Sequence, residues 1–279
     1  MLKKTMIVAV FLWGLVNSAL AGQGQPLKEP TVDDIVRKAT HMALYQGVDA
    51  KGNVVMVITD RQGRTWKREF NVLRKDDSES DTDQKYFVFF LEPADVRKMV
   101  FMVHKHAAPG TDDDRWLYMP SLDLVKRIAA SDKRTSFMGS DFLYEDISGR
   151  NPLEDTHELV KTTDDYYVLK SVPKVPVSVE FAWYITYVDK KTFMPVKMEY
   201  FRNNGTPYRV VEMKKTEKIK ARENNRDVTY LTVTREMAAD LENGSKTEMT
   251  FSNIRFNLGL NDAIFTERYL RRPPRDAMR

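Results

Sequence analysis

The residues whose types could perform chemistry are few, and they are not grouped as a catalytic or metal site requires. His104 and His106 would share one face of a strand, as two metal ligands should, but no motif with a further histidine or glutamate accompanies them. Gly139-Ser140-Asp141 lacks the Gly-x-Ser-x-Gly pattern of a nucleophile elbow. Asp112-Asp113-Asp114 lacks the glycine and the distal glutamate of a calcium loop, so we expect a turn there.

The composition excludes further classes of function. None of the 279 residues is a cysteine, which rules out disulfides, thiolate nucleophiles and cysteine-ligated metals. The 44 basic and 40 acidic residues are well mixed and give a net charge of +4, which argues against nucleic acid as the main partner. Since 42% of the residues are apolar, the chain can bury a sizeable core. We therefore expect a folded protein that is not an enzyme and holds no metal or cofactor.

The first 21 residues have the pattern of a signal peptide. Lys3 and Lys4 precede an apolar stretch at positions 5–16, and Ala19-Leu20-Ala21 offers small residues where signal peptidase cleaves. Cleavage after Ala21 would leave residues 22–279, with a net charge that falls from +4 to +2 because the two lysines are lost. An uncleaved membrane anchor is the alternative. A chain without cysteine also cannot be acylated as bacterial lipoproteins are, so we expect a soluble periplasmic protein in a Gram-negative bacterium.

The clearest helical pattern begins after Thr31. Val32, Ile35, Val36 and Ala39 fall on one stripe at helical spacing, which continues to residue 43. Thr31 suits the N-cap position, and two aspartates follow in the first turn, where the helix dipole favours acids. We expect an ordinary amphipathic helix whose apolar stripe faces the core.

From residue 51 onward the apolar pattern has a period of two, which is typical of half-buried strands. The alternating sets are Trp66, Arg68, Phe70 and Val72; then Val177, Val179, Phe181, Trp183, Ile185 and Tyr187; then Met194, Val196, Met198 and Tyr200. Turn signals stand at 61–63, 189–191, 203–205 and 242–244. Because short connections join antiparallel neighbours, the sequence predicts an antiparallel meander of about ten strands.

One segment is apolar at consecutive positions. Tyr86 to Leu91 would present large side chains on both faces of a strand, so both faces must be covered, one by the interior and the other by a loop. The acidic stretch from Asp76 to Asp81 precedes it, and we expect a solvated loop that protects a neighbouring sheet edge.

A sheet of this size with few helices has too much one-sided apolar surface for one helix to bury. It must curl into a barrel or half-barrel, and a barrel of more than ~8 strands is too wide for side chains to fill. The sequence therefore predicts an apolar cavity. Its candidate lining residues are Trp66, Phe70, Phe181, Trp183, Met194, Met198 and Tyr200. The 14 methionines would suit either a soft lining or ordinary core packing.

The segment from Arg115 to Arg150 carries a family resemblance. Its marks are Arg115-Trp116-Leu117-Tyr118-Met119-Pro120, Lys126-Arg127-Ile128, Ser131-Asp132-Lys133-Arg134, Ser136-Phe137-Met138-Gly139-Ser140-Asp141-Phe142 and Tyr144-Glu145-Asp146-Ile147, with Pro93-Ala94-Asp95-Val96-Arg97 upstream. This pattern closely resembles the periplasmic outer membrane lipoprotein-sorting protein family, whose members are relatives of the lipoprotein carriers LolA and LolB.

The resemblance implies a fold and a function. Residues 22–279 would form one LolA-like domain, a half-open antiparallel β-barrel with an N-terminal helix and short lid helices around an apolar cavity. Such a protein would carry a lipid or a lipidated polypeptide across the periplasm as a monomer, together with an inner-membrane exporter of the RND or MMPL type. Without a cysteine, this chain resembles the soluble carrier rather than the anchored receptor.

Two sets of residues are expected at the binding site. Acyl chains would contact Trp66, Phe70, Trp116, Tyr118, Phe137, Met138, Phe142, Phe181, Trp183 and Met198. A basic cluster of Lys126, Arg127, Lys133 and Arg134 would bind phosphate headgroups or an acidic partner, or would simply be solvated.

Gly139 stands between large apolar residues and could let a loop plug or open the barrel mouth, or the same residues could close one end for stability. Ser140 and the acids after it predict the N-cap and first turn of a short helix.

The leading hypothesis is a carrier, because affinity for acyl chains needs an apolar cavity and no chemistry. An exporter adaptor that carries nothing is the second hypothesis. A hydrolase that uses Ser140 is the third. An integral outer-membrane barrel is disfavoured because the outward faces of the strands carry Lys, Glu and Arg.

Overall fold

The structure is a computed structural model that describes residues 29–77 and 81–278. The chain divides into two units, Met1–Pro30 and Thr31–Arg279, and the account below concerns the second. The predicted signal peptide at 1–21 lies outside the described residues, as do positions 78–80 of the predicted acidic loop.

The described residues form 13 strands in a single antiparallel sheet, which confirms the predicted mainly β class. The strands are β1 (Asp49–Thr59), β2 (Thr65–Asp76), β3 (Gln84–Glu92), β4 (Val100–Lys105), β5 (Asp114–Met119), β6 (Leu124–Arg127), β7 (Asp155–Thr162), β8 (Tyr166–Pro173), β9 (Trp183–Asp189), β10 (Pro195–Phe201), β11 (Pro207–Glu223), β12 (Arg226–Asp240) and β13 (Ser245–Phe256). The estimate of about ten strands was too low.

The helices are short except for the first. They are α1 (Val32–Leu44), α2 (Tyr144–Ser148), α3 (Arg268–Arg271) and α4 (Arg275–Met278), with 3₁₀ turns η1 (Pro120–Leu122), η2 (Ala130–Asp132), η3 (Pro152–Glu154), η4 (Pro176–Ser178) and η5 (Asp262–Phe265). The predicted start of α1 is confirmed, since the Thr31 side chain accepts the Asp34 N–H and the Asp34 side chain accepts the Thr31 N–H in a capping box.

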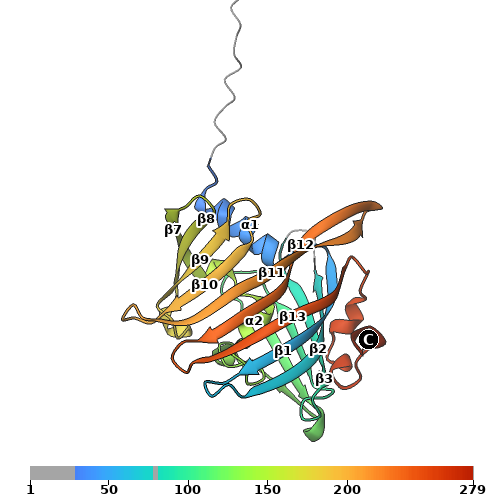
Figure 1. Cartoon of the computed structure of the whole chain (residues 1–279). Helices are drawn as coiled ribbons and strands as arrows, with labels where there is room; N and C mark the ends of the chain where they lie inside the picture. Colours follow the sequence, from blue (N-terminus) through green and yellow to red (C-terminus); the bar gives the residue numbers. More distant parts are fainter. Residues whose placement is uncertain (1–28, 78–80, 279) are drawn as a thin grey trace, which may run out of the picture. The chain divides into compact units, whose positions relative to one another are not determined.

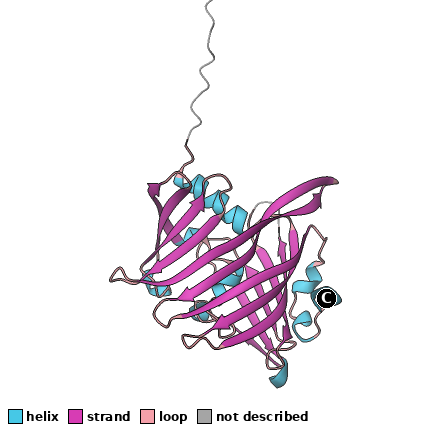
Figure 2. Ribbon diagram, viewed as in Figure 1, coloured by secondary structure: helices cyan, strands magenta, loops and turns pink. Residues whose placement is uncertain are grey.

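The sheet is an open half-barrel. Its strand order is β6-β5-β4-β3-β2-β1-β13-β12-β11-β10-β9-β8-β7, so β6 and β7 are the two edges and do not pair with each other. One apolar cluster nevertheless joins Phe70 and Phe90 of one half to Tyr184 and Tyr200 of the other, because the sheet curls around them. Figure 2 shows the strands curving around α1 and the segment that contains α2.

The connection from β6 to β7 fills much of the concave face. This crossing segment, residues 128–154, buries the side chains of Phe137, Phe142 and Tyr144 in the main cluster. The Phe137 ring lies 5.5 Å from the ring centroids of Phe101 and Tyr144. The part of the family motif that follows β6 is therefore an internal plug, whereas its first part forms β5 and β6.

The prediction for β3 is confirmed. Tyr86, Val88 and Phe90 face the main cluster, while Phe87 and Phe89 belong to a second cluster on the opposite face. That second cluster is covered by the C-terminal segment 258–278, which brings Leu260, Ile264, Phe265 and Leu270 onto β2–β5. Figure 1 shows this segment in red against the outside of the sheet.

Three local expectations are wrong. Residues 177–182 do not form a strand, because η4 occupies Pro176–Ser178 and β9 begins at Trp183. The short helix begins at Tyr144 with Leu143 as N-cap, because the Ser140 hydroxyl bonds within its own turn. The sheet edge that the acidic stretch was expected to protect is absent from the described strands on either side of it, because β2 and β3 are each paired on both sides.

We predict that Phe137→Ala destabilises the protein by about 3–5 kcal/mol, because it removes a fully buried ring from the centre of the plug. Urea unfolding followed by circular dichroism measures this. Val177→Ala, at a side chain that is 95% exposed, is the control and should change the stability by less than about 0.5 kcal/mol. A loss below about 1 kcal/mol for Phe137→Ala would contradict a tightly packed plug.

Candidate functional site

The concave face holds a cavity of about 390 Å³ that the plug does not fill. Its walls come from α1, from β1–β3 and β7–β13, and from residues 142–152 of the crossing segment. The side chains that define it are mostly apolar, among them Val36, Met42, Leu169, Val211, Phe251 and Ile254. A volume of this size lies within the range of sites for small ligands. The predicted apolar cavity is thus present.

The structure places the predicted acyl-contact residues in three different environments. Phe142 and Met198 line the cavity, as does Tyr200. Phe70, Phe137 and Phe181 are buried in the main cluster and Met138 packs against it, so they support the wall without lining the cavity.

Four further predicted residues lie away from the cavity. Trp116 and Tyr118 belong to the outer cluster beneath the C-terminal segment. Trp66 is 47% exposed, and Trp183 stacks on Phe201 with ring centroids 5.5 Å apart.

The lining face of β9 is the opposite one from that expected. Tyr184, Thr186 and Val188 line the cavity, whereas Trp183 and Ile185 do not. The alternation was read correctly, but it does not show which face of a strand is the inward one, and the candidate Trp183 is on the other face. Tyr184 can face inward because its hydroxyl donates to the Asp155 carboxylate, at 2.7 Å.

Sequence reasoning missed most of the lining on α1, β12 and β13. Val36, Ala39 and Met42 of α1 were expected to be ordinary core residues, yet they form one wall of the cavity. In β13, Met249 and Phe251 alternate with polar residues, a period-two signal that could have identified an inward face.

Methionines are found in both of the places considered for them, the cavity lining and the packed core. Met42, Met198 and Met213 line the cavity, whereas Met56 and Met102 are fully buried in the core clusters. Flexible thioether side chains on three different elements can adjust to an irregular apolar ligand.

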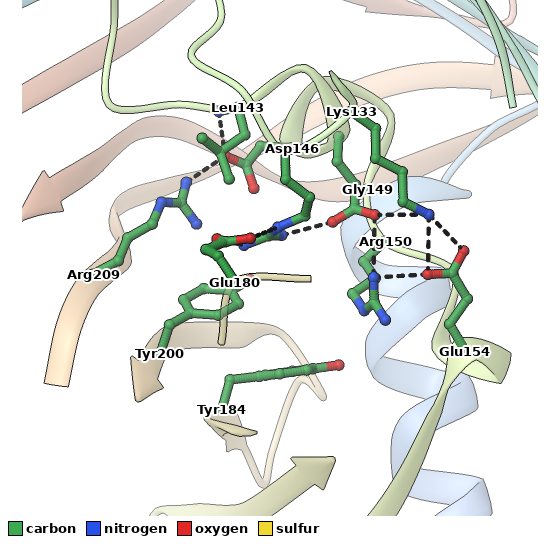
Figure 3. Close-up of polar contacts among 12 residues, drawn as sticks. Lys133, Leu143, Asp146, Gly149, Arg150, Glu154, Glu180, Tyr184, Tyr200 and Arg209 are labelled. Carbon is green, nitrogen blue, oxygen red and sulfur yellow. Dashed lines mark hydrogen bonds and ion pairs between the residues drawn. The ribbon is translucent and has the colours of Figure 1, made fainter. Parts of the chain in front are cut away.

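A buried network of charges fixes the crossing segment beside the cavity (Figure 3). Its centre is Glu145 of α2, whose carboxylate contacts Arg134 Nη1 at 2.6 Å and Arg150 Nη1 at 3.2 Å. Arg134 makes a bidentate pair with Glu180, at 2.9 and 2.7 Å, and Arg150 makes one with Asp155, at 2.8 Å for both bonds. Arg134 thus joins the crossing segment to Glu180, which precedes β9. Arg150 joins the same segment to Asp155, the first residue of β7.

The carboxylates of this network are held ionised. Burial raises the pKa of Glu145, but Arg134 and Arg150 outweigh it and hold this pKa below its usual range. Burial also opposes ionisation of Glu180, yet Arg134 and the Tyr208 hydroxyl lower its pKa to about 2. Such a network positions the segment and leaves no reactive group exposed.

The basic cluster expected to bind headgroups is divided in the structure. Lys133 and Arg134 are buried and paired with Glu145, so they hold the plug rather than offer a surface. Lys126 and Arg127 are exposed on the short edge strand β6, where charged side chains discourage pairing with other chains.

Glu236 of β12 is a carboxyl group in the cavity wall. It lies across from Met213 and Met249, and it has no hydrogen-bond or ion-pair partner among residues 29–77 and 81–278. Burial and the nearby Asp146 raise its pKa to about 7, although Arg209 acts in the opposite direction. Near neutral pH this group can therefore offer a proton to a polar part of a ligand.

The side chains considered earlier as a nucleophile or as metal ligands, Ser140, His104 and His106, make hydrogen bonds that hold the fold together. The Ser140 hydroxyl donates to the Phe137 carbonyl at 2.6 Å and accepts the Phe142 N–H at 3.2 Å. His104 contacts the Phe265 carbonyl, and His106 contacts Asp83 and Asp114. Within the described residues, no group of side chains could hold a metal ion, and no helix is both long and apolar enough to cross a membrane.

Comparison with solved structures identifies the fold. A DUF1329 family protein from Desulfovibrio piger is 28% identical with a TM-score of 0.74, covering 86% of this chain and 98% of that one. A protein from Vibrio parahaemolyticus described as an outer membrane lipoprotein-sorting domain is 24% identical with a TM-score of 0.73, covering 85% and 97%. A LolA superfamily protein from Nitrosomonas europaea is 22% identical with a TM-score of 0.64, covering 86% and 99%.

These likenesses define a LolA-like fold, in agreement with the family resemblance of the 115–150 segment. A family model whose description reads "Uncharacterized protein" matches residues 82–272, and the chain belongs to that family. No curated protein matches the sequence.

We predict that Glu236→Gln stabilises the protein above pH 7 and has little effect at pH 4.5. The pKa of Glu236 is about 7 in the folded state against 4.5 in the unfolded state, so folding favours the protonated carboxyl. The favourable contribution of the protonated Glu236 carboxyl to the free energy of unfolding is complete below pH 4.5. This contribution is lost as the pH rises through 7. At pH 8 the variant should melt about 7 °C higher than the wild type, because the raised pKa corresponds to roughly 3 kcal/mol of stability.

Thermal unfolding from pH 4.5 to pH 8 measures this difference. Glu158→Gln, at an exposed carboxyl on β7, is the control and should follow the wild type throughout. A Glu236→Gln variant with the same advantage at both pH values would contradict a raised pKa.

Proposed function

We propose that the protein is a soluble periplasmic carrier, which holds acyl chains of a lipid or lipidated protein in the cavity and moves them toward the outer membrane. The observation that carries this proposal is the apolar cavity between α1 and the concave face of a LolA-like sheet. Each buried CH₂ contributes roughly 0.8 kcal/mol, so one long chain could contribute about 10 kcal/mol before ordering costs. That affinity requires no catalytic residue.

Transfer also requires a partner, because tight binding alone gives no direction. We assign this role to an inner-membrane exporter of the RND or MMPL type, with the carrier working as a monomer. The partner would open the cavity or bind the cargo more tightly than the carrier does.

The alternative is an adaptor that docks on such an exporter and carries nothing. Its support is the crossing segment, which already fills much of the concave face with Phe137, Phe142 and Tyr144. A carrier is recovered with cargo, whereas an adaptor is recovered empty, so lipid mass spectrometry of protein purified from a native periplasm separates the two.

We predict that Thr186→Trp weakens binding of a fluorescent fatty-acid analogue at least about tenfold, because the indole fills space opposite Met198 in the cavity. Fluorescence titration of purified protein measures the affinity. A variant that binds as tightly as the wild type would place the ligand elsewhere.

Ile185→Trp is the matched control, because it adds a ring to the same strand at a position outside the cavity lining. It should bind like the wild type. Circular dichroism and melting of both variants identify any loss of folding. A wild-type protein that is empty after purification and binds no analogue would overturn the carrier proposal.

We also predict that the protein recovered from the periplasmic fraction begins at Gly22, as cleavage after Ala21 requires. Intact-mass measurement gives the N-terminus. A chain that begins at Met1 and stays with the membrane would support the uncleaved anchor instead.

A further inference from the structure

The outer part of the β11–β12 hairpin extends past both of its neighbouring strands. β10 pairs with β11 only between Pro207 and Glu212, and β13 pairs with β12 only from Arg235 to Asp240. Residues 213–234 therefore form a two-stranded ribbon without a third strand among the described residues. Asn224 and Asn225, at φ of 48° and 62°, make the tight turn at its tip. Figure 1 shows this ribbon projecting from the sheet at the upper right, where β12 is labelled.

The two faces of the ribbon differ in character. The strand alternation places Lys218, Lys220 and Arg222 on one face, and all three are exposed. The other face carries Ile219 opposite Tyr230, whose ring lies 4.7 Å from the Phe256 ring. We call the face with Lys218, Lys220 and Arg222 the basic face. Packing on the other face holds the ribbon in a fixed orientation.

The ribbon is strongly basic and only partly neutralised. Residues 214–227 contain six lysines and arginines against three acids. Lys214, Lys215 and Arg222 pair with acids on the same ribbon or beside it. Lys218 and Lys220 have no ion-pair partner in the part of the chain that the structure describes. These two lysines thus present uncompensated charge to the solvent on the basic face.

The ribbon also adjoins the cavity. Met213, Thr232 and Val233 at its base line the cavity. Gln46, just after α1, donates a hydrogen bond to the Leu231 carbonyl at 2.6 Å. Strand alternation places Thr232 on the same face as Tyr230, so the cavity adjoins the base of the ribbon on the face opposite to the basic face.

We propose that the basic face, Lys218, Lys220 and Arg222, docks the protein on a membrane surface that contains anionic phospholipid. Alternate residues on a strand stand about 7 Å apart, so the three side chains form a row of cations without a pocket. A row of flexible cations suits a mobile layer of phosphate headgroups better than one fixed anion, and the projection of the ribbon lets it reach that layer. The inference goes beyond the carrier proposal, because docking requires no cargo.

Vesicle co-sedimentation tests the proposal with the full mature chain. The probes are phosphatidylcholine vesicles with and without one-third phosphatidylglycerol, each at low and high salt. We expect binding only to the vesicles with phosphatidylglycerol, and release by salt. Replacing Lys218, Lys220 and Arg222 with Glu should weaken binding about 100-fold or more, as removal of three surface cations requires.

A second triple variant with the same change in net charge is the control. Arg61, Lys161 and Lys191 are exposed and lie outside the ribbon, so their replacement by Glu should leave most of the binding intact. Equal loss in both triple variants would overturn the proposal, because only net charge would then matter.

Equal binding to both kinds of vesicle would also overturn it. Ribbon-dependent binding to soluble polyglutamate without vesicle binding would assign the basic face to an acidic protein instead. Fatty-acid titration of the ribbon variant separates this result from the carrier proposal, because loss of docking should leave that affinity unchanged.

Discussion

The need to cover the concave face of a large open sheet governs this structure. Thirteen antiparallel strands curl without closing, so neither edge strand is joined to the other and the interior would be open to water. Helix α1 and the crossing segment 128–154 cover that face from within. They cover it incompletely, and the space that remains is the cavity. The cavity therefore arises because the sheet is too wide for the few elements packed inside it to fill.

The crossing segment, residues 128–154, is held in place by ion pairs as well as by apolar packing. Phe137 and Phe142 bury their rings, while Glu145 joins Arg134 and Arg150. A buried ion pair contributes modest net stability, but removal of one partner leaves an unpaired charge in the interior, which costs several kcal/mol. The network therefore specifies one position for the segment. Any movement of this segment out of the sheet would have to compensate these charges.

The outward face of the sheet is covered by a different part of the chain. The C-terminal segment lies across β2–β5, where Asn71 donates to the Ala277 carbonyl and Lys75 to the Leu260 carbonyl. It covers the outward aromatic residues of β3 that would otherwise be exposed. It also covers Trp116 and Tyr118 of β5. Their aromatic side chains are thus buried against the C-terminal segment, away from the cavity.

The sequence by itself determined the antiparallel β class, the start of α1 after Thr31 and the double covering of β3, because these follow from local periodicity and capping. It also indicated an enclosed apolar space. Only the tertiary structure decided which face of β9 lines that space, and that Lys133 and Arg134 are buried. Alternation identifies two faces of a strand but not the inward one, since burial of Tyr184 depends on Asp155, 29 residues away in the chain. Likewise, a cation is exposed or buried according to the carboxylates that folding brings to it.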